Sequence, residues 1–414
     1  MSTKQRVGKG FSAFMKNDGK TKLTRREILK ASLTAGGVAL VGFHEMQLPA
    51  FGGDVKKDGF QGGKYLGRIQ FLGEGRIPMD TPMGDGLDGR LYTDLSAITP
   101  ESLITPTGKF YVRTGASDLL DDRKLWVIKV GGLVSQSAEV SMTDLRKISR
   151  PAGLHLMECS GNVRLAHFGM LSVADWTGAR VSELLDSVKI DRAASHILIS
   201  GFDRYPDDSP TSTPGKSWIF TLGELSSSKA FFATEMNGAS LTRDHGAPVR
   251  LVVPGWYGCA CIKWVDEITL LGENAETTSQ MREYAGRTMQ HGVPELVKDY
   301  RPAIIEQAAM PIRTERWLVE RKIKYRVTGI AWGGSRPIST LEIRFSSEPN
   351  SSEDFIQVDD FAQPANDPWS FWTHAWTPTK PGTYFIQLRV KDRTIRPRRL
   401  DAGYYVRSVE ITEI

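Results

Sequence analysis

The chain has 414 residues, of which 40% are hydrophobic and 24% are charged; this globular composition is long enough for two domains and excludes a fibrous or wholly disordered protein. The net charge of +5 is concentrated at the start, because residues 1–30 carry nine Lys or Arg against Asp18 and Glu27, which leaves the remaining chain near −2. We therefore expect no nucleic-acid partner for the processed protein.

Residues 1–50 predict an export signal. The stretch "TRREILKASLTAGGVALVGF" places Arg25 and Arg26 before an apolar run and resembles a twin-arginine signal, with Ile28 in place of the usual Phe. The apolar run, residues 31–43, is shorter than the roughly 20 residues that span a bilayer, so we expect a cleaved signal and a periplasmic protein. Retention as a membrane anchor and a basic amphipathic surface helix are the alternatives. Export would expose three cysteines to an oxidising compartment, where they cannot all pair within one chain.

Residues 51–108 are rich in Gly and Pro and predict an irregular segment that leads into the first domain. Within it, "GDGLDG" at residues 84–89 has the G-x-G-x-x-G spacing of dinucleotide sites. Such a site needs a strand before the glycines, and "IPMDTPM" stands there instead. We therefore predict a loop.

Residues 109–300 predict an α+β domain, because short strand patterns alternate with helical ones. The strand patterns are "LWVIKVGGLV", "HILISGF" and "PVRLVVPG", and the helical patterns are "SMTDLRKI" and "ARVSELLDSV". "DDSPTSTPGKS", residues 207–217, predicts a loop inside this domain.

Residues 300–314 contain proline and predict a connector, after which residues 315–414 change in character. "KIKYRVTGIAW", "STLEIRFSS", "GTYFIQLRVKD" and "GYYVRSVEITEI" alternate apolar and polar residues between turn formers, which is typical of an immunoglobulin-like β-sandwich. Trp369, Trp372 and Trp376 are expected to pack in its core rather than to stack on a ligand.

A single cysteine, Cys159, ends the apolar part of "LHLMECSGNVRLAHF". It has three candidate roles: a buried structural thiol, a nucleophile with His155 or His167 as its base, or a metal ligand. A zinc hydrolase has little support, because Cys259 and Cys261 form a C-x-C pair without a second pair of ligands. The residues alone leave these roles open.

"MECSGNVR", residues 157–164, resembles the motif with which the sulfite oxidase family of molybdenum enzymes holds a pterin-bound metal through one cysteine thiolate. Further segments resemble this family in the same order along the chain: "FYVRTG", "DWTGARVSELL", "SGFDRYP", "EMNGASLTRDHGAPVRLVVPG", "IKWVDEITL" and "MREY". The resemblance is strong over residues 109–284 and weak in the C-terminal sandwich.

The resemblance implies a sulfite oxidase-type molybdopterin-binding domain at residues 109–300 and an immunoglobulin-like dimerisation domain at residues 315–414. It implies that Cys159 binds the metal and that Arg113, Arg164 and Tyr284 meet the substrate. Positively charged and donor groups would anchor the anionic cofactor, molybdenum-molybdopterin. The implied cofactor-binding residues are Tyr111, Arg113, Thr114, Cys159, Asp203, His245, Arg250, Cys261 and Lys263. Without the family, each of these residues could be an ordinary surface charge or capping group.

The implied reaction is transfer of an oxygen atom to a small sulfur oxyanion, most simply sulfite to sulfate. The chain has no C-x-x-C-H haem motif, so we expect the electrons to pass to a separate cytochrome c, in a homodimer or a complex with a cytochrome subunit. A sulfoxide reductase of the same family and a non-catalytic secreted binding protein are the alternatives.

The chain departs from the family pattern around the substrate. Val163 stands where relatives often carry Arg, and Gly258-Cys259-Ala260 replaces a "GAR" sequence. The family's tryptophan and lysine between Arg164 and Trp176 have no counterpart. These changes weaken the case for sulfite while leaving the metal site intact. Cys259 and Cys261 are expected to be small buried residues, with a C-x-C disulfide as the alternative.

Overall fold

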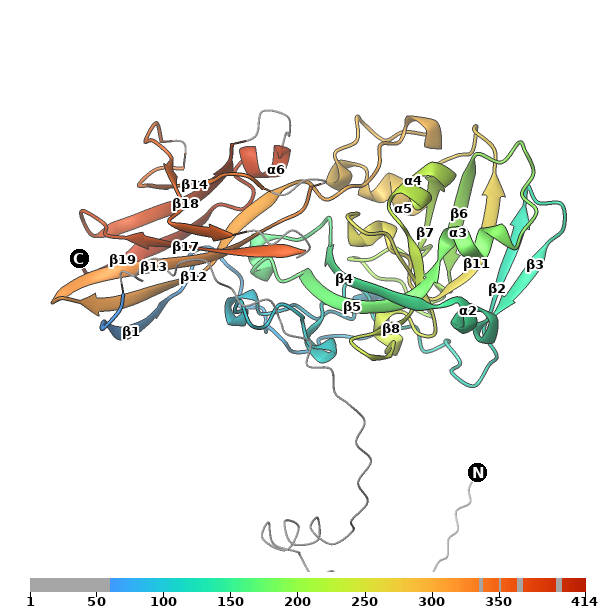
Figure 1. The fold of residues 1–414 in the computed structure, drawn as a ribbon, viewed down its shortest axis with the longest axis horizontal. Coiled ribbons are helices and arrows are strands. Elements are labelled where there is room, and N and C mark those ends of the chain that lie inside the picture. Colours follow the sequence, from blue (N-terminus) through green and yellow to red (C-terminus); the bar gives the residue numbers. More distant parts are fainter. Residues whose placement is uncertain (1–59, 335–337, 350, 363–367, 392–396) are drawn as a thin grey trace, which may run out of the picture. The chain divides into compact units, whose positions relative to one another are not determined.

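The computed structural model describes residues 60–334, 338–349, 351–362, 368–391 and 397–414 (Figure 1). The predicted export signal at residues 1–50 lies outside the described residues, as does the beginning of the irregular segment. Asp58–Ile414 is one compact unit. Among the residues that the structure describes, no helix is both long and apolar enough to cross a bilayer.

Two sheets form the part of the chain that precedes residue 300, drawn in green to yellow in Figure 1. One has the order β10-β8-β5-β4, with the short β9 paired to β8, and its pairs are antiparallel. The other has the order β3-β2-β11-β6-β7, in which β11 pairs with β2 in parallel and with β6 antiparallel. The bounds are β2 Val127–Gly132, β3 Ala138–Ser141, β4 Arg150–Glu158, β5 Leu171–Arg180, β6 His196–Gly201, β7 Ser217–Thr221, β8 Phe231–Met236, β9 Ala239–Ser240, β10 Arg250–Val252 and β11 Val265–Leu271.

Short helices connect these strands: α2 Met142–Ile148, α3 Val181–Asp186, α4 Leu222–Ser227 and α5 Ser279–Tyr284. Hydroxyl side chains fix three of their starts. Ser141, Thr221 and Thr278 each accept a hydrogen bond from a backbone N–H three residues later, which satisfies a donor that the first turn leaves free. The α+β prediction is confirmed, and its two helical patterns correspond to α2 and α3.

The C-terminal part consists of two antiparallel sheets, with the orders β1-β12-β13-β17-β16 and β15-β14-β18-β19. Their inner faces pack through aromatic rings: Phe345 stacks on Trp376 with a centroid distance of 4.3 Å. Trp369 and Trp372 are also buried, as expected. The bounds are β1 Lys64–Ile69, β12 Ala308–Val319, β13 Lys322–Trp332, β14 Leu341–Ser346, β15 Ile356–Gln357, β16 Asp360–Ala362, β17 Trp369–Trp376, β18 Gly382–Val390 and β19 Arg407–Ile411, with a short helix α6 at Arg398–Asp401.

Two expectations for the irregular parts need correction, and one is confirmed. The predicted connector at residues 300–314 is wrong from residue 308 onward, because β12 begins there. The irregular segment also contributes a strand, β1, which pairs with β12. By contrast, residues 84–89 form a loop with a single 3-10 turn, Gly86–Asp88, as predicted.

Candidate functional site

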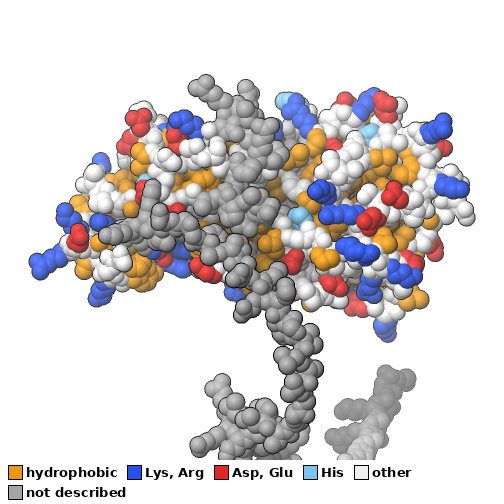
Figure 2. Space-filling model, viewed as in Figure 1, with side chains coloured by type: hydrophobic (Ala, Val, Ile, Leu, Met, Phe, Trp, Pro, Cys, Tyr) orange, Lys and Arg blue, Asp and Glu red, His pale blue; other side chains and the backbone are white. Residues whose placement is uncertain are grey.

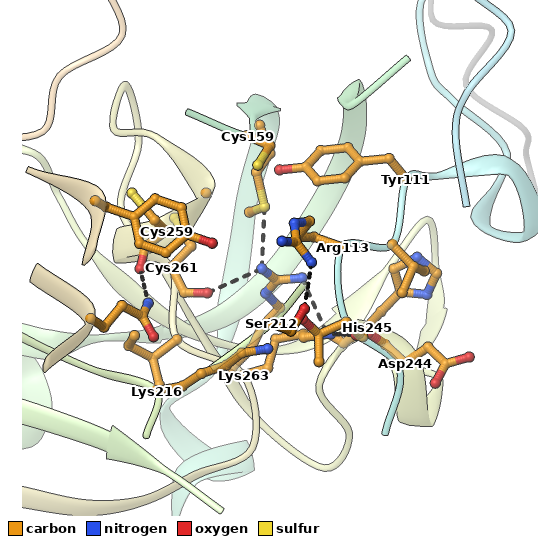
Figure 3. Close-up of a pocket in the computed structure, with 18 of the residues that line it drawn as sticks. Tyr111, Arg113, Cys159, Ser212, Lys216, Asp244, His245, Cys259, Cys261 and Lys263 are labelled. Atoms are coloured by element: carbon orange, nitrogen blue, oxygen red, sulfur yellow. Dashed lines mark hydrogen bonds between the residues drawn. The ribbon is translucent and has the colours of Figure 1, made fainter. Parts of the chain in front are cut away.

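A pocket of about 780 Å³, open solvent included, lies where the loops of both sheets before residue 300 meet (Figure 3). Its lining comes from the segment after residue 109, the end of β4, the loop before β7, the chain around β10 and β11, and α5. The lining residues used below are Tyr111, Arg113, Thr114, Met157, Cys159, Ser212, Lys216, Asp244, His245, Arg250, Gly258, Cys259, Cys261, Lys263, Gln280 and Tyr284.

Cys159 is the first residue after β4, and its side chain faces the pocket. The chain turns sharply there: the Cys159 N–H donates to the Met170 carbonyl at 3.0 Å, and the Asn162 N–H donates to the Cys159 carbonyl at 2.9 Å. The Gly161 N–H lies 3.4 Å from Sγ. Burial raises the pKa of the thiol, whereas the charges of Arg113 and Arg287 oppose that rise. A bound metal cation would stabilise the negative charge on Sγ and so favour the thiolate form of Cys159.

Tyr111 points its hydroxyl toward the Cys159 side chain (Figure 3). A Cβ at Gly258 would stand 2.5 Å from that hydroxyl, so the position admits only glycine. Next to it, Gln280 of α5 donates to the Cys259 carbonyl at 2.5 Å. The turn around Gly258 is therefore fixed against the pocket from two sides.

One wall of the pocket is cationic. Arg250 donates from Nη1 to the His245 carbonyl at 3.1 Å and from Nη2 to the Cys261 carbonyl at 3.3 Å, and its buried Nε has no partner. Lys263 donates to the carbonyls of Thr114 and Asp244. Within the described residues, no carboxylate forms an ion pair with either side chain. Arg250 Nη2 also donates to the Met157 sulfur at 3.2 Å. Buried cations that are bonded only to neutral acceptors favour an anionic ligand.

Lys216 stands close to this wall. Burial and the charges of Arg113, Arg90 and Arg250 lower the pKa of Lys216 to about 8, and Asp203 only partly opposes them. Burial and Lys216 likewise place the pKa of Lys263 well below its usual value. On the surface of this half, Lys and Arg side chains lie among Asp and Glu side chains in the view of Figure 2. The concentration of positive charge is therefore a feature of the pocket wall formed by Arg250, Lys263 and Lys216.

His245, one of the implied cofactor-binding residues, lines the pocket. Its Nε2 lies 3.1 Å from the Phe110 carbonyl, which can only accept, so Nε2 carries the hydrogen. Its Nδ1 then accepts from the Thr242 hydroxyl at 2.6 Å. Burial, helped by nearby cations, lowers the pKa of His245 to about 4. It therefore lines the pocket as a neutral ring that fixes the backbone at Phe110.

Arg113 and Tyr284 line the pocket on the side of Cys159. The Arg113 guanidinium donates to Ser212 Oγ at 2.8 Å and to the Thr211 carbonyl at 2.9 Å (Figure 3). Burial raises the pKa of Tyr284, so the phenol keeps its proton and can donate. Both residues lie where the sequence analysis places them, beside the thiol.

Arg164 and Asp203 do not line this pocket. Arg164 begins a 3-10 turn, Arg164–Ala166, and its buried Nε has no partner. Asp203 lies behind the wall, where its Oδ2 accepts from the Lys216 N–H at 2.6 Å. No contact between Arg164 and this pocket therefore supports its predicted role in binding the substrate.

Arg287 is a residue that the sequence analysis missed. A Cβ at Gly161 would lie 3.6 Å from its Nη1 and 3.8 Å from Cys159 Sγ, so the guanidinium and the thiol face the same small space. The guanidinium also lies 5.0 Å from the centre of the Tyr284 ring. Arg287 follows Tyr284 by three residues, a spacing that places two side chains on the same face of a helix. This spacing is the sequence signal that could have pointed to Arg287. Lys216 was likewise treated only as part of a loop.

The described cysteines are all free, so the C-x-C disulfide alternative is wrong. Cys261 Sγ accepts from the Val253 N–H at 3.4 Å, which is a packing role inside the wall. Among the residues that the structure describes, no three His, Cys, Asp or Glu side chains are grouped to hold a metal ion. Three thiols thus line the pocket, and of these Cys159 is the one on which the charges of Arg113 and Arg287 act.

These residues fit a metal that is bound through a single thiolate and carried by an anionic organic cofactor. The thiol faces the pocket, the buried Arg250 and Lys263 lack carboxylate partners, and Arg250 Nε is left without a hydrogen bond. Soft sulfur ligands suit a molybdenum cofactor, and phosphate oxygens suit the Arg and Lys donors.

The sequence matches known proteins across this region. Residues 115–279 match the family described as the oxidoreductase molybdopterin binding domain. The chain is 29% identical over 263 residues to mitochondrial sulfite oxidase of Rattus norvegicus, which covers 59% of this chain and 47% of the relative. For the Homo sapiens enzyme the identity is 27% over 333 residues, covering 76% and 59%. An NADPH nitrate reductase of Fusarium oxysporum is 27% identical over 287 residues, covering 60% and 30%. The chain thus spans about half the length of the curated sulfite oxidases it matches.

The fold is shared with a solved structure. The sulfane dehydrogenase SoxCD of Paracoccus pantotrophus superimposes with a TM-score of 0.57 at 18% identity, covering 92% of this chain and 96% of that chain. At this identity the likeness concerns the fold. The molybdopterin-binding match over residues 115–279 and the sulfite oxidase relatives place this region with the sulfite oxidase family of molybdopterin-dependent oxidoreductases.

Proposed function

We propose that this protein is an exported oxidoreductase that transfers an oxygen atom from water to a small sulfur oxyanion, most simply sulfite. The reaction converts sulfite and one water molecule into sulfate, two protons and two electrons, and the electrons leave to a separate carrier. The observation that supports it most is the position of Cys159, whose thiol faces a pocket with a cationic wall and lies near the guanidinium groups of Arg113 and Arg287. The named sulfite oxidases are the relatives that support this substrate class.

Cys159 would hold the molybdenum through Sγ, and the cationic wall of Arg250, Lys263 and Lys216 would receive the anionic end of the cofactor. When bound, the cofactor supplies the oxygen-transfer and two-electron chemistry. The chain supplies the charge balance, because a cofactor anion would offset the repulsion that lowers the pKa of Lys216. Tyr111 and His245 keep the pocket walls in place.

The substrate anion would be bound by Arg113 and Arg287, which both direct positive charge toward Cys159. Guanidinium groups suit oxyanions because their N–H donors match two oxygens at once. Tyr284 retains its proton and would donate a hydrogen bond to an oxygen of the substrate. In this arrangement Arg287 supplies the second positive charge of the substrate pocket, the part that the sequence pattern assigned to Arg164.

We further propose a periplasmic protein that passes its electrons to a cytochrome c, as a homodimer or with a cytochrome subunit. The twin-arginine-like start and the absence of a haem attachment motif in this sequence support this arrangement. A twin-arginine signal suits the proposed cofactor, because that route carries proteins that are already folded.

The test is metal analysis and turnover of the protein isolated from cells supplied with molybdate. We expect one molybdenum per chain, reduction of cytochrome c on addition of sulfite, and loss of both in Cys159→Ser. Cys259→Ser is the matched control, since Cys259 is also buried at the pocket and is expected to retain the metal. Absence of molybdenum from the unaltered protein would refute the proposal. Turnover only with nitrate, or only with a sulfoxide and a reduced dye, would refute the substrate and the direction.

A further inference from the structure

The residue before Cys159 is a buried carboxylate that the C-terminal sandwich holds. Glu158 is 0% exposed, although it is the last residue of β4. Trp332, at the end of β13, donates from Nε1 to Glu158 Oε2 at 2.9 Å. Tyr405, just before β19, donates its hydroxyl to Oε1 at 3.0 Å. Both carboxylate oxygens are therefore bonded to side chains more than 170 residues away in the sequence.

The residues after Cys159 are held from the same direction. Arg399 of α6 donates from Nη2 to the Ser160 carbonyl at 2.7 Å, and Tyr404 donates its hydroxyl to the Asn162 carbonyl. The Arg399 guanidinium also lies 4.8 Å from the Tyr257 ring and 5.1 Å from the Tyr404 ring. The turn that carries the thiol is thus bonded on both sides to a single stretch of chain, residues 399–405, with Trp332 beside it.

The cluster holds one buried carboxyl group, that of Glu158, and one buried guanidinium, that of Arg399. Burial raises the pKa of Glu158, and Arg399 and the two hydrogen bonds oppose that rise. Because an indole N–H can only donate, Glu158 Oε2 must accept. A buried charged network is costly and is often replaceable by apolar residues without loss of stability. Its presence beside one thiol suggests that it fixes geometry as well as fold.

We propose that Glu158 and Arg399 are positioning residues for the metal-binding thiol: through them the C-terminal sandwich holds the turn at Cys159 and sets the direction in which Sγ points. Neither residue lines the pocket, and both act on Cys159 through the neighbouring chain. The inference rests on the proposed role of Cys159 as the metal ligand. In metal sites generally, groups that orient a ligand affect affinity and activity about 10- to 100-fold.

The test compares Tyr405→Phe and Glu158→Gln with a matched control, Tyr325→Phe. Tyr405 and Tyr325 are both buried in the sandwich and each loses one hydroxyl hydrogen bond, but the Tyr325 hydroxyl bonds the Glu413 carbonyl. Tyr405→Phe removes one bond to Glu158 without changing volume. Glu158→Gln places an amide where Trp332 and Tyr405 both donate hydrogen bonds, so this variant carries the greater risk to folding. If Glu158→Gln does not fold, Tyr405→Phe alone decides the test.

The first readout uses full-length protein made in cells that lack the cofactor, and it measures alkylation of each cysteine by iodoacetamide with mass spectrometry. We expect Cys159 to react severalfold faster in Tyr405→Phe than in the unaltered protein, while Tyr325→Phe matches the unaltered protein and Cys259 stays unreactive. Equal Cys159 rates in Tyr405→Phe and Tyr325→Phe would refute the positioning role. This result does not depend on whether the protein binds molybdenum.

The second readout uses the loaded protein. We expect Tyr405→Phe to shift the electron paramagnetic resonance signal of the reduced molybdenum and to lower kcat about tenfold with little change in KM. Tyr325→Phe should leave the signal unchanged. A loaded Tyr405→Phe protein with an unaltered signal and kcat would also refute the role, whereas a wild-type protein without molybdenum would refute the proposed function instead.

Discussion

Arg287 carries the clearest prediction for a single residue. Replacing it with Gln removes a charge that faces the same space as Cys159 Sγ. We therefore expect KM for sulfite to rise about 10- to 100-fold, which corresponds to the loss of one charge-assisted hydrogen bond. The change in kcat should be smaller. Arg164→Gln should leave KM nearly unchanged, because Arg164, unlike Arg287, is not among the charges that act on the Cys159 thiol. Arg282→Gln is the control, since Arg282 is an exposed charge on the preceding helix α5. Steady-state kinetics decides, and a larger effect at Arg164 than at Arg287 would reverse the assignment.

The lowered pKa of Lys216 predicts that the stability of the cofactor-free protein depends on pH. This pKa is lowered from 10.5 to about 8 by burial and neighbouring cations, so below pH 8 the folded state carries the full cost of a disfavoured charge. Between pH 8 and pH 10.5 the unfolded state binds more protons than the folded state, so that cost disappears as the pH rises through this range. Lys216→Met should therefore be more stable than the unaltered protein below pH 8, by on the order of 1 kcal/mol after allowing for the solvent that reaches the pocket. The advantage should vanish near pH 10.5. Urea unfolding at a series of pH values measures it, and a difference that stays constant with pH would contradict this reading.

The sequence could predict residues whose roles depend on a local motif, and it missed residues whose roles depend on distant packing. Cys159, Arg113 and Tyr284 lie in short recognisable segments, and all of them line the pocket. Arg287 becomes relevant only because the turn after α5 brings it to Gly161. The lowered pKa of His245 follows from its burial, which no local sequence pattern records.

At the scale of elements, the alternating patterns predicted strands well, and β12 shows why a strand can be missed. Pro311 lies inside β12. Because proline has no backbone N–H to donate to a neighbouring strand, the sequence pattern of this segment predicts a connector rather than a strand. The structure places Pro311 where the register between β12 and β13 shifts. A β-bulge leaves a residue unpaired, so proline is tolerated there without breaking the strand.

Gly329 on β13 gives a stability prediction for this sheet. A Cβ at this position would stand 2.1 Å from a Trp372 ring carbon and 2.3 Å from the Met310 carbonyl. We expect Gly329→Ala to lower the free energy of unfolding by about 1–3 kcal/mol through overpacking. Gly223→Ala is the opposite case: Gly223 lies in α4 with no atom closer than 4.0 Å, so alanine should raise stability by about 0.5–1 kcal/mol. Thermal unfolding of both variants checks the two signs, and a neutral Gly329→Ala would show that the indole can move aside.

At the scale of the whole molecule, the two parts of the chain share one site. The α+β part supplies the thiol and the cationic wall, and the sandwich supplies Trp332, Arg399 and Tyr405 around the turn. The sequence analysis described these parts as separate domains, since nothing in a local pattern shows that a strand end near residue 332 meets residue 158. The sandwich should therefore be considered part of the proposed metal site as well as a candidate dimerisation surface.

This shared site bears on export. If the cofactor is enclosed only when both parts have folded, loading has to precede passage across the membrane, which suits a twin-arginine route. We expect Arg25→Lys combined with Arg26→Lys to leave molybdenum-loaded protein in the cytoplasm, because the paired guanidinium groups are read rather than the charge alone. Lys20→Arg combined with Lys22→Arg changes two basic residues of the same segment and should be exported normally. Cell fractionation with metal analysis of each fraction measures the outcome, and periplasmic recovery of the Arg25 and Arg26 double variant would show that another route carries this protein.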